Sequence, residues 1–138
     1  MQVKVAWNKG VSFVARSETD HEATMDGPEN LGGQNKGMRP MEMLLAGMGG
    51  CTSFDVVTIL KKSRQDVHNC EAIISAERAD EVPKVFTKIH ILFKICGKNL
   101  NPKSVERAID LSASKYCSAS IMLSKAVNIT HDFELQEV

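Results

Sequence analysis

Residues 39–60 read RPMEMLLAGMGGCTSFDVVTIL, a mostly apolar segment with a single cysteine, Cys51, near its middle. Pro40 suits the first position of an α-helix, where the missing N–H is not needed, and Glu42 would place a negative charge near the positive end of the helix. Apolar side chains fall on nearly every face of such a helix, which is typical of a helix covered on all sides. The segment therefore predicts a central buried helix, or two helices that meet at its glycines.

The glycines of this segment, Gly47, Gly49 and Gly50, come just before Cys51. In a helix interior each glycine costs about 1 kcal/mol relative to alanine, so we expect another part of the backbone to approach closely at this point. A cysteine beside such a site is either an inert small core residue or a reactive thiol. The residues alone leave both interpretations open.

The 138 residues are predicted to form one domain, 1–138, that needs no disulfide to fold. Lys+Arg and Asp+Glu both count 17, so there is no basic field to attract nucleic acid. The segment 39–60 is long enough to cross a bilayer, but Arg39, Glu42 and Asp55 within it argue against a membrane protein. The first ten residues, MQVKVAWNKG, lack the pattern of a secretory signal, which predicts a cytoplasmic protein with reduced thiols.

None of the four cysteines is spaced as a metal ligand: Cys51, Cys70, Cys96 and Cys117 form no CxxC pair and no pattern with histidine. Neither a metal nor a bound cofactor is expected. The motifs GxGxxG, GxxxxGK[ST] and GxSxG are also absent, which argues against the common nucleotide-binding and hydrolase sites. Cys70 and Cys96 fall in strand patterns and are expected to pack rather than react.

Alternating apolar and polar residues predict strands at 2–7, 11–15, 21–25, 69–78, 84–96 and 127–135. Asn101 and Pro102 predict the cap and first turn of a helix to about residue 115, and Cys117 precedes a further short helix. The polar, glycine-rich residues 29–37 predict a loop and candidate lid. The order of elements predicts an α+β fold with antiparallel sheets wrapped around long central helices.

The apolar surface of these predicted helices is too large to be covered easily within a small chain. We therefore expect a two-fold homodimer with a shared helical core.

Three short motifs carry a resemblance: PMEMLLA at 40–46, GGCT at 49–52 and YCS at 116–118. Together with the order of elements, they resemble the OsmC/Ohr family over essentially the whole chain, and within it the YhfA-like branch. The family implies an entwined homodimer with two long central helices and two thiol sites at the subunit interface. Its characterised members are thiol-dependent peroxidases that reduce organic hydroperoxides in oxidative stress defence.

The resemblance implies roles for two cysteines. Cys51 would be the peroxidatic residue, whose thiolate attacks the O–O bond and leaves an alcohol and a sulfenic acid. Cys117 would condense with the sulfenic acid to a disulfide, which an external dithiol or lipoyl-type reductant must reduce.

The family pattern also includes a carboxylate and an arginine that orient the thiolate, and this chain departs from it. The hydroperoxide-reducing members carry a glutamate directly after the proline, whereas here Glu42 stands one position later, which is about 100° around a helix. On a straight helix Glu42 and Cys51 would lie about 13 Å apart along the axis and on opposite sides, so Glu42 would serve the Cys51 of the partner subunit, or the helix bends. Glu42 could equally cap its own helix. Arg39 and Arg16 are the candidates for the thiolate-orienting arginine.

Three further polar residues lie close to the two cysteines in the sequence. Ser118 and Ser120 could hydrogen-bond a thiolate or cap the short helix. Asp55, one turn after Cys51, is expected to have a structural or partner-contacting role.

The sequence therefore predicts a cytoplasmic, homodimeric, thiol-dependent peroxidase. The alternative is a stress protein of the same fold that senses redox state or binds a small ligand without turnover. A third interpretation is a structural stress protein whose cysteines are incidental.

Overall fold

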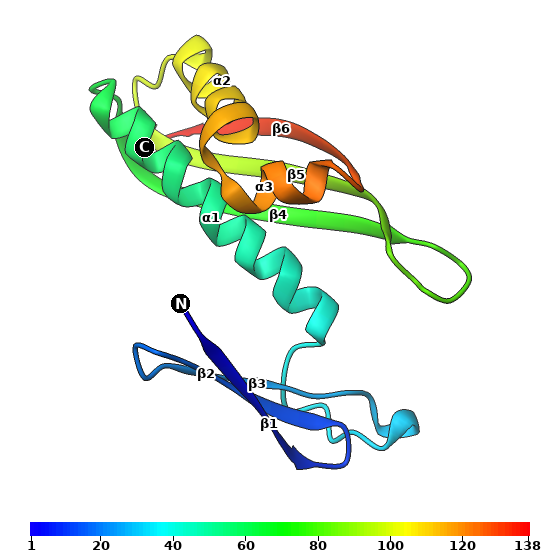
Figure 1. Cartoon of the computed structure of the whole chain (residues 1–138). Helices are drawn as coiled ribbons and strands as arrows, with labels where there is room; N and C mark the ends of the chain where they lie inside the picture. Colours follow the sequence, from blue (N-terminus) through cyan, green and yellow to red (C-terminus); the bar gives the residue numbers. More distant parts are fainter. The chain divides into compact units, whose positions relative to one another are not determined.

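The computed structural model describes residues 1–138 and contains the predicted order of strands and helices (Figure 1). The strands are β1 (Val3–Lys9), β2 (Ser12–Ser17), β3 (Glu22–Met25), β4 (Asp66–Arg78), β5 (Phe86–Lys98) and β6 (Asn128–Glu137). The helices are α1 (Pro40–Lys62), α2 (Pro102–Leu111) and α3 (Ser118–Ser124), with a short 3-10 turn η1 (Glu29–Leu31) and a π-helical turn η2 (Ser112–Tyr116). The chain forms two compact units, Met1–Ala46 and Gly47–Val138.

The first unit contains an antiparallel sheet in the order β1-β2-β3. The predicted hairpin is confirmed, and its turn places Gly10 at a φ of 57°, where a side chain would be strained. The indole of Trp7 donates a hydrogen bond of 2.9 Å to the carbonyl of Gly10. The apolar residues of β1 are exposed in the single chain, and the side chain of Trp7 is 70% exposed.

The predicted loop after β3 is held together by Asp26, a buried carboxylate. One oxygen accepts a hydrogen bond from the N–H of Gly27 (2.7 Å), and the other accepts bonds from the N–H groups of Gln34 and Lys36 (3.1 Å each). These bonds hold the pKa of Asp26 below its ordinary 3.8, and the nearby charge of Arg39 lowers the pKa further. A single carboxylate therefore connects both ends of the loop.

The loop should lose this connection in strong acid. Because folding lowers the pKa of Asp26, its stabilising effect is complete above pH 3.8 and disappears as the pH falls through the lower pKa of the folded state. At neutral pH, Asp26→Asn should speed hydrogen exchange at the amides of Gln34 and Lys36 by about tenfold or more, since hydrogen bonds to a charged acceptor are the stronger ones. Nuclear magnetic resonance would measure this. Unchanged exchange at both amides would show that other contacts hold the loop.

The second unit contains a sheet in the order β4-β5-β6. The predicted hairpin of β4 and β5 is confirmed as antiparallel, although β4 begins at Asp66 rather than 69. The prediction of wholly antiparallel sheets is wrong for β6, which pairs with β5 in parallel. The reason is the connection: α2, η2 and α3 lie between these strands and return the chain to the end at which β5 begins, so β6 must run in the same direction.

Helix α1 is continuous from Pro40 to Lys62, so the alternative of two helices meeting at the glycines is wrong. The expected close approach occurs at Gly49 alone, and it involves a side chain rather than a backbone. A Cβ at Gly49 would lie 2.6 Å from Cδ1 of Ile74 on β4, whereas Gly47 and Gly50 have no neighbouring atom within 4 Å. Only Gly49 is therefore required for packing within this chain.

The core of the second unit lies between its sheet and the three helices, which cover one face of that sheet (Figure 1). Its residues are fully or almost fully buried: Met48, Val56, Leu60, Ile89, Ile91, Phe93, Ile95, Val105, Ala108 and Ile109. As predicted, the Asn101 side chain caps α2 by accepting hydrogen bonds from the N–H groups of Lys103 and Ser104. The other face of β5 is mainly polar, with Lys88, His90 and Lys94 exposed on it, so the core is one-sided.

The sequence predicts that helix α1 is buried on all sides, but side chains of this chain leave part of it exposed. The side chain of Leu44 is 50% exposed and that of Phe54 is 71% exposed. By length and composition alone α1 could also cross a membrane, a criterion that core helices of soluble proteins meet as well. An apolar face of α1 is thus left open in the single chain.

Candidate functional site

The fold brings Cys51 and Cys117 together, although they are far apart in the sequence. Cys51 lies on α1 and is half-buried, whereas Cys117 lies between η2 and α3 and is fully buried. The two thiols lie close enough for the Cys51 thiol to raise the pKa of the Cys117 thiol. Two free thiols in this arrangement can be joined by a disulfide when they are oxidised.

The backbone around Cys117 is tightly held. Cys117 is the residue at which α3 is capped, and its sulfur accepts a hydrogen bond of 3.3 Å from the N–H of Ser120. The N–H of Cys117 donates a hydrogen bond to the carbonyl of Ser112 (2.8 Å). The carbonyl of Cys117 accepts a hydrogen bond from the N–H of Ile121 (3.0 Å). These bonds fix the Cys117 sulfur and backbone relative to η2 and α3.

Opposing effects act on the pKa of Cys117. Burial raises the pKa most, and the neighbouring Cys51 thiol raises it further. The side chain and the N–H of Ser120 lower the pKa, since both can donate to a thiolate. The net direction is upward, so Cys117 stays a thiol unless a reaction or a change of surroundings favours its anion.

A buried polar network fixes α1 against η2 next to the two cysteines. The hydroxyls of Thr52 and Ser112, sixty residues apart in the sequence and both fully buried, lie 2.8 Å apart. The Ser112 hydroxyl also lies 3.1 Å from the carboxylate of Asp55, to which it can donate. Thr52 directly follows Cys51, and the carbonyl of Ser112 accepts a hydrogen bond from the N–H of Cys117. The contact between Thr52 and Ser112 therefore helps to fix the two cysteines relative to each other. Asp55 therefore has a structural contact within the chain, one of the two roles expected for it.

Removing the Ser112 hydroxyl should destabilise the protein. Ser112→Ala leaves the buried Thr52 hydroxyl without its partner and Asp55 without a donor. We expect the free energy of unfolding to fall by about 1–3 kcal/mol, the usual effect of leaving a buried polar group unsatisfied. Urea denaturation of the reduced protein would measure the change. Ser118→Ala is the matched control, because Ser118 is exposed, and an equal loss in both variants would contradict the assigned role.

A cleft of ≈ 410 Å³ opens one turn beyond Cys51 along α1, and neither Cys51 nor Cys117 lines it. Its lining residues are Phe54, Asp55, Thr58, Ile59, Lys62, Ser63, Leu111 and Tyr116. Residues three and four positions after Cys51 share its side of the helix. The volume suits a small organic molecule, and the lining is mainly apolar.

Glu42 and Arg39 lie together at the start of α1, in the first unit. The carboxylate of Glu42 accepts a hydrogen bond of 2.8 Å from the N–H of Arg39, so Glu42 does cap its own helix. The guanidinium of Arg39 donates to the carbonyls of Asp26 (3.4 Å) and Gly37 (3.3 Å) through Nη1. Its Nε and Nη2 make no hydrogen bond, so they can still bind an anion.

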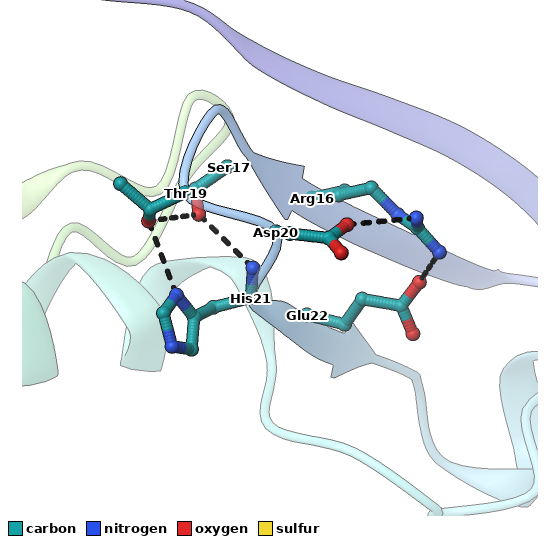
Figure 2. Close-up of polar contacts among 6 residues, drawn as sticks. All are labelled: Arg16, Ser17, Thr19, Asp20, His21 and Glu22. Atoms are coloured by element: carbon teal, nitrogen blue, oxygen red, sulfur yellow. Dashed lines mark hydrogen bonds and ion pairs between the residues drawn. The ribbon is translucent and has the colours of Figure 1, made fainter.

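Arg16, the other candidate arginine, is already paired within the first sheet. Figure 2 shows its guanidinium between the carboxylates of Asp20 and Glu22, with one ion pair to each. Beside it, the Thr19 hydroxyl bridges Ser17 and His21. Two carboxylates neutralise Arg16, which makes it a weaker candidate than Arg39 for binding a thiolate.

The remaining cysteines pack in the sheet. Cys70 is half-buried on β4, and burial raises the pKa of its thiol. Cys96 is half-buried on β5. The expectation that both are strand residues is confirmed.

Sequence reasoning missed the hydrogen bond between the hydroxyls of Thr52 and Ser112. No sequence pattern links two hydroxyl groups that are sixty residues apart.

Comparisons with known proteins agree on the fold. The family described as "OsmC-like protein" matches residues 33–132. The chain is 48% identical over 135 residues to "Protein YhfA" of Escherichia coli (strain K12), with 98% of each chain covered. A crystal structure of a hypothetical protein from Aquifex aeolicus VF5 is 29% identical, with a TM-score of 0.87 over 99% of this chain and 96% of that chain. The organic hydroperoxide resistance protein OhrB of Bacillus subtilis has a TM-score of 0.65 over 97% and 98% of the two chains, and its 17% identity shows a shared fold alone.

Proposed function

Because the chain belongs to the OsmC family, we propose that it is a thiol-dependent peroxidase that reduces organic hydroperoxides, with Cys51 as the nucleophile and Cys117 as the resolving thiol. One observation carries the proposal: the two thiols lie side by side, and Cys51 is the more accessible of the two. A peroxidatic sulfur must meet the peroxide, whereas a resolving sulfur needs only to reach the first sulfur. The site is consistent with both requirements.

The reaction follows from this placement. The Cys51 thiolate attacks one oxygen of the hydroperoxide, so an S–O bond forms, the O–O bond breaks, and the alcohol leaves after taking up a proton. The Cys117 sulfur then attacks the Cys51 sulfenic acid, an S–S bond forms, and water leaves. Two electrons from an external dithiol, such as a lipoyl-type reductant, restore the two thiols. No bound cofactor or metal takes part in this scheme, and a protein of this chemistry suits the reducing cytoplasm.

The cleft one turn beyond Cys51 supports an organic rather than an inorganic peroxide. The apolar part of its lining, Phe54, Ile59, Leu111 and Tyr116, can contact a bulky apolar group, which hydrogen peroxide does not have. We assign the third catalytic role to Glu42, which with Arg39 or Arg16 orients the Cys51 thiolate in the assembled protein. The unused donors of Arg39 favour it over Arg16.

The proposed assembly is a homodimer in which the open face of α1 packs on a second copy. Phe54, which also lines the cleft, is exposed on this face, so the cleft would lie at the subunit interface. Gly47 and Gly50 leave the face without side-chain bulk. Burial of such an apolar face is the usual driving force of a two-fold interface. Sedimentation equilibrium should therefore give twice the chain mass of 15.2 kDa. A mass of one chain at micromolar concentration would contradict the dimer.

Peroxide consumption tests the proposed activity. The purified protein is assayed with cumene hydroperoxide and with hydrogen peroxide, each with dihydrolipoamide and with dithiothreitol as the reductant. We expect multiple turnovers, with the organic peroxide consumed faster. No turnover under any combination would reject the peroxidase.

The alternative is a protein of the same fold that senses oxidants or holds a small apolar ligand without turnover. The self-capping contact between Glu42 and the Arg39 N–H favours it, because one of the two oxygens of this carboxylate is already used as a helix cap. Retention of a ligand in the cleft, together with stoichiometric rather than catalytic loss of peroxide, would support this alternative.

A further inference from the structure

The structure distinguishes the two sulfurs of the proposed disulfide, and this inference rests on the proposed function of Cys51 and Cys117. The Cys117 side chain has an exposed fraction of 0%, whereas Cys51 is half-buried. A thiol that opens a disulfide must approach the attacked sulfur in line with the S–S bond, on the side away from the other sulfur. At Cys117 that side is filled by protein.

The leaving sulfur also needs stabilisation. Attack at Cys51 releases Cys117 as a thiolate, and a disulfide opens faster when the pKa of the leaving thiol is lower. Burial and the Cys51 thiol both raise the pKa of Cys117, so its surroundings must offset this effect if it is to leave. The only groups that lower the pKa of Cys117 belong to Ser120.

Ser120 has an unused hydroxyl at this point. Its side chain is 2% exposed, and its Oγ has no hydrogen-bond partner in the resting protein. Its N–H already donates to the Cys117 sulfur at 3.3 Å. A buried hydroxyl without a partner is costly, and a thiolate formed at Cys117 would provide one.

We propose that the external reductant opens the Cys51–Cys117 disulfide at the Cys51 sulfur, and that the N–H and hydroxyl of Ser120 receive Cys117 as the leaving thiolate. In the first step the thiolate of the reductant forms an S–S bond with Cys51, the Cys51–Cys117 bond breaks, and the electron pair stays on Cys117. In the second step the other thiol of the dithiol reductant displaces Cys51 and closes its own disulfide. Two protons then restore both thiols. Ser120 acts directly on the leaving sulfur of Cys117, because its N–H already donates to that sulfur.

The first test locates the attacked sulfur in the unaltered protein. Diamide closes the disulfide, so the test does not depend on peroxidase activity. The other thiols are blocked, excess glutathione is added, and acid stops the exchange before peptide mass spectrometry. We expect the glutathione adduct on the Cys51 peptide. An adduct on Cys117, equal labelling of both cysteines, or failure of diamide to form this disulfide would overturn the inference, whether or not the protein reduces peroxides.

The second test concerns Ser120. We expect Ser120→Ala to slow the opening of the diamide-formed disulfide by dithiothreitol about tenfold, the usual effect of one lost hydrogen bond to an anion. Ser120→Thr keeps the hydroxyl and should restore the rate, and the matched control Ser118→Ala should match the wild-type protein. Thiolate absorbance should also appear at higher pH in Ser120→Ala. An unchanged rate in Ser120→Ala, or no rescue by threonine in a folded variant, would overturn the role of Ser120.

Discussion

Cys51→Ser is expected to abolish peroxide consumption, with the turnover rate falling by about 10³-fold or more. The physical reason is the nucleophile: a serine hydroxyl does not ionise near neutral pH, and its oxygen attacks an O–O bond far more slowly than a thiolate sulfur. The measurement is the loss of cumene hydroperoxide with dihydrolipoamide in excess. The fold should persist, because Cys51 is half-buried and the substitution is small.

Matched cysteine variants make this prediction specific. Cys70→Ser removes a half-buried thiol of similar exposure from β4 and should keep the wild-type rate. Without any reductant, Cys117→Ser should reduce one equivalent of peroxide and then stop, with a sulfenic acid on Cys51 that dimedone can trap. If Cys51→Ser kept turnover while Cys70→Ser lost it, the site would be elsewhere in the chain.

Phe93→Ala is expected to have the largest effect on stability. Phe93 is fully buried on β5, pairs with Ala72 and Phe133 on the two neighbouring strands, and its ring lies 6.4 Å from the stacked ring of His131. Removing a buried aromatic ring costs about 3–5 kcal/mol in transfer free energy and cavity formation. Because small proteins are stable by about 5–15 kcal/mol, this change removes a large part of the total.

Urea denaturation at fixed protein concentration would measure the effect on the midpoint and the slope. Met122→Ala is the control, since the Met122 side chain is 70% exposed on α3, and its expected change is within about 0.5 kcal/mol. A loss below about 1 kcal/mol in Phe93→Ala would mean that the core collapses around the missing ring.

Local patterns determined most of the elements. Alternation of apolar and polar residues predicted β1, β2, β4 and β5, since side chains of a strand point to opposite faces. Asn101 and Pro102 predicted the start of α2 through the chemistry of its first turn. These signals act over a few residues, so the sequence contains them in full. Membership of the OsmC family likewise followed from short motifs around Cys51 and Cys117.

Only the tertiary structure decided how distant residues meet. The parallel pairing of β6 depends on the path of the chain through α2 and α3, which alternation within β6 does not contain. The contact of Thr52 with Ser112, and the burial that separates Cys117 from the more accessible Cys51, arise when α1 packs on η2. Local patterns specify elements because they act through neighbouring backbone groups. The site depends on contacts across sixty residues, which exist only after the core has formed.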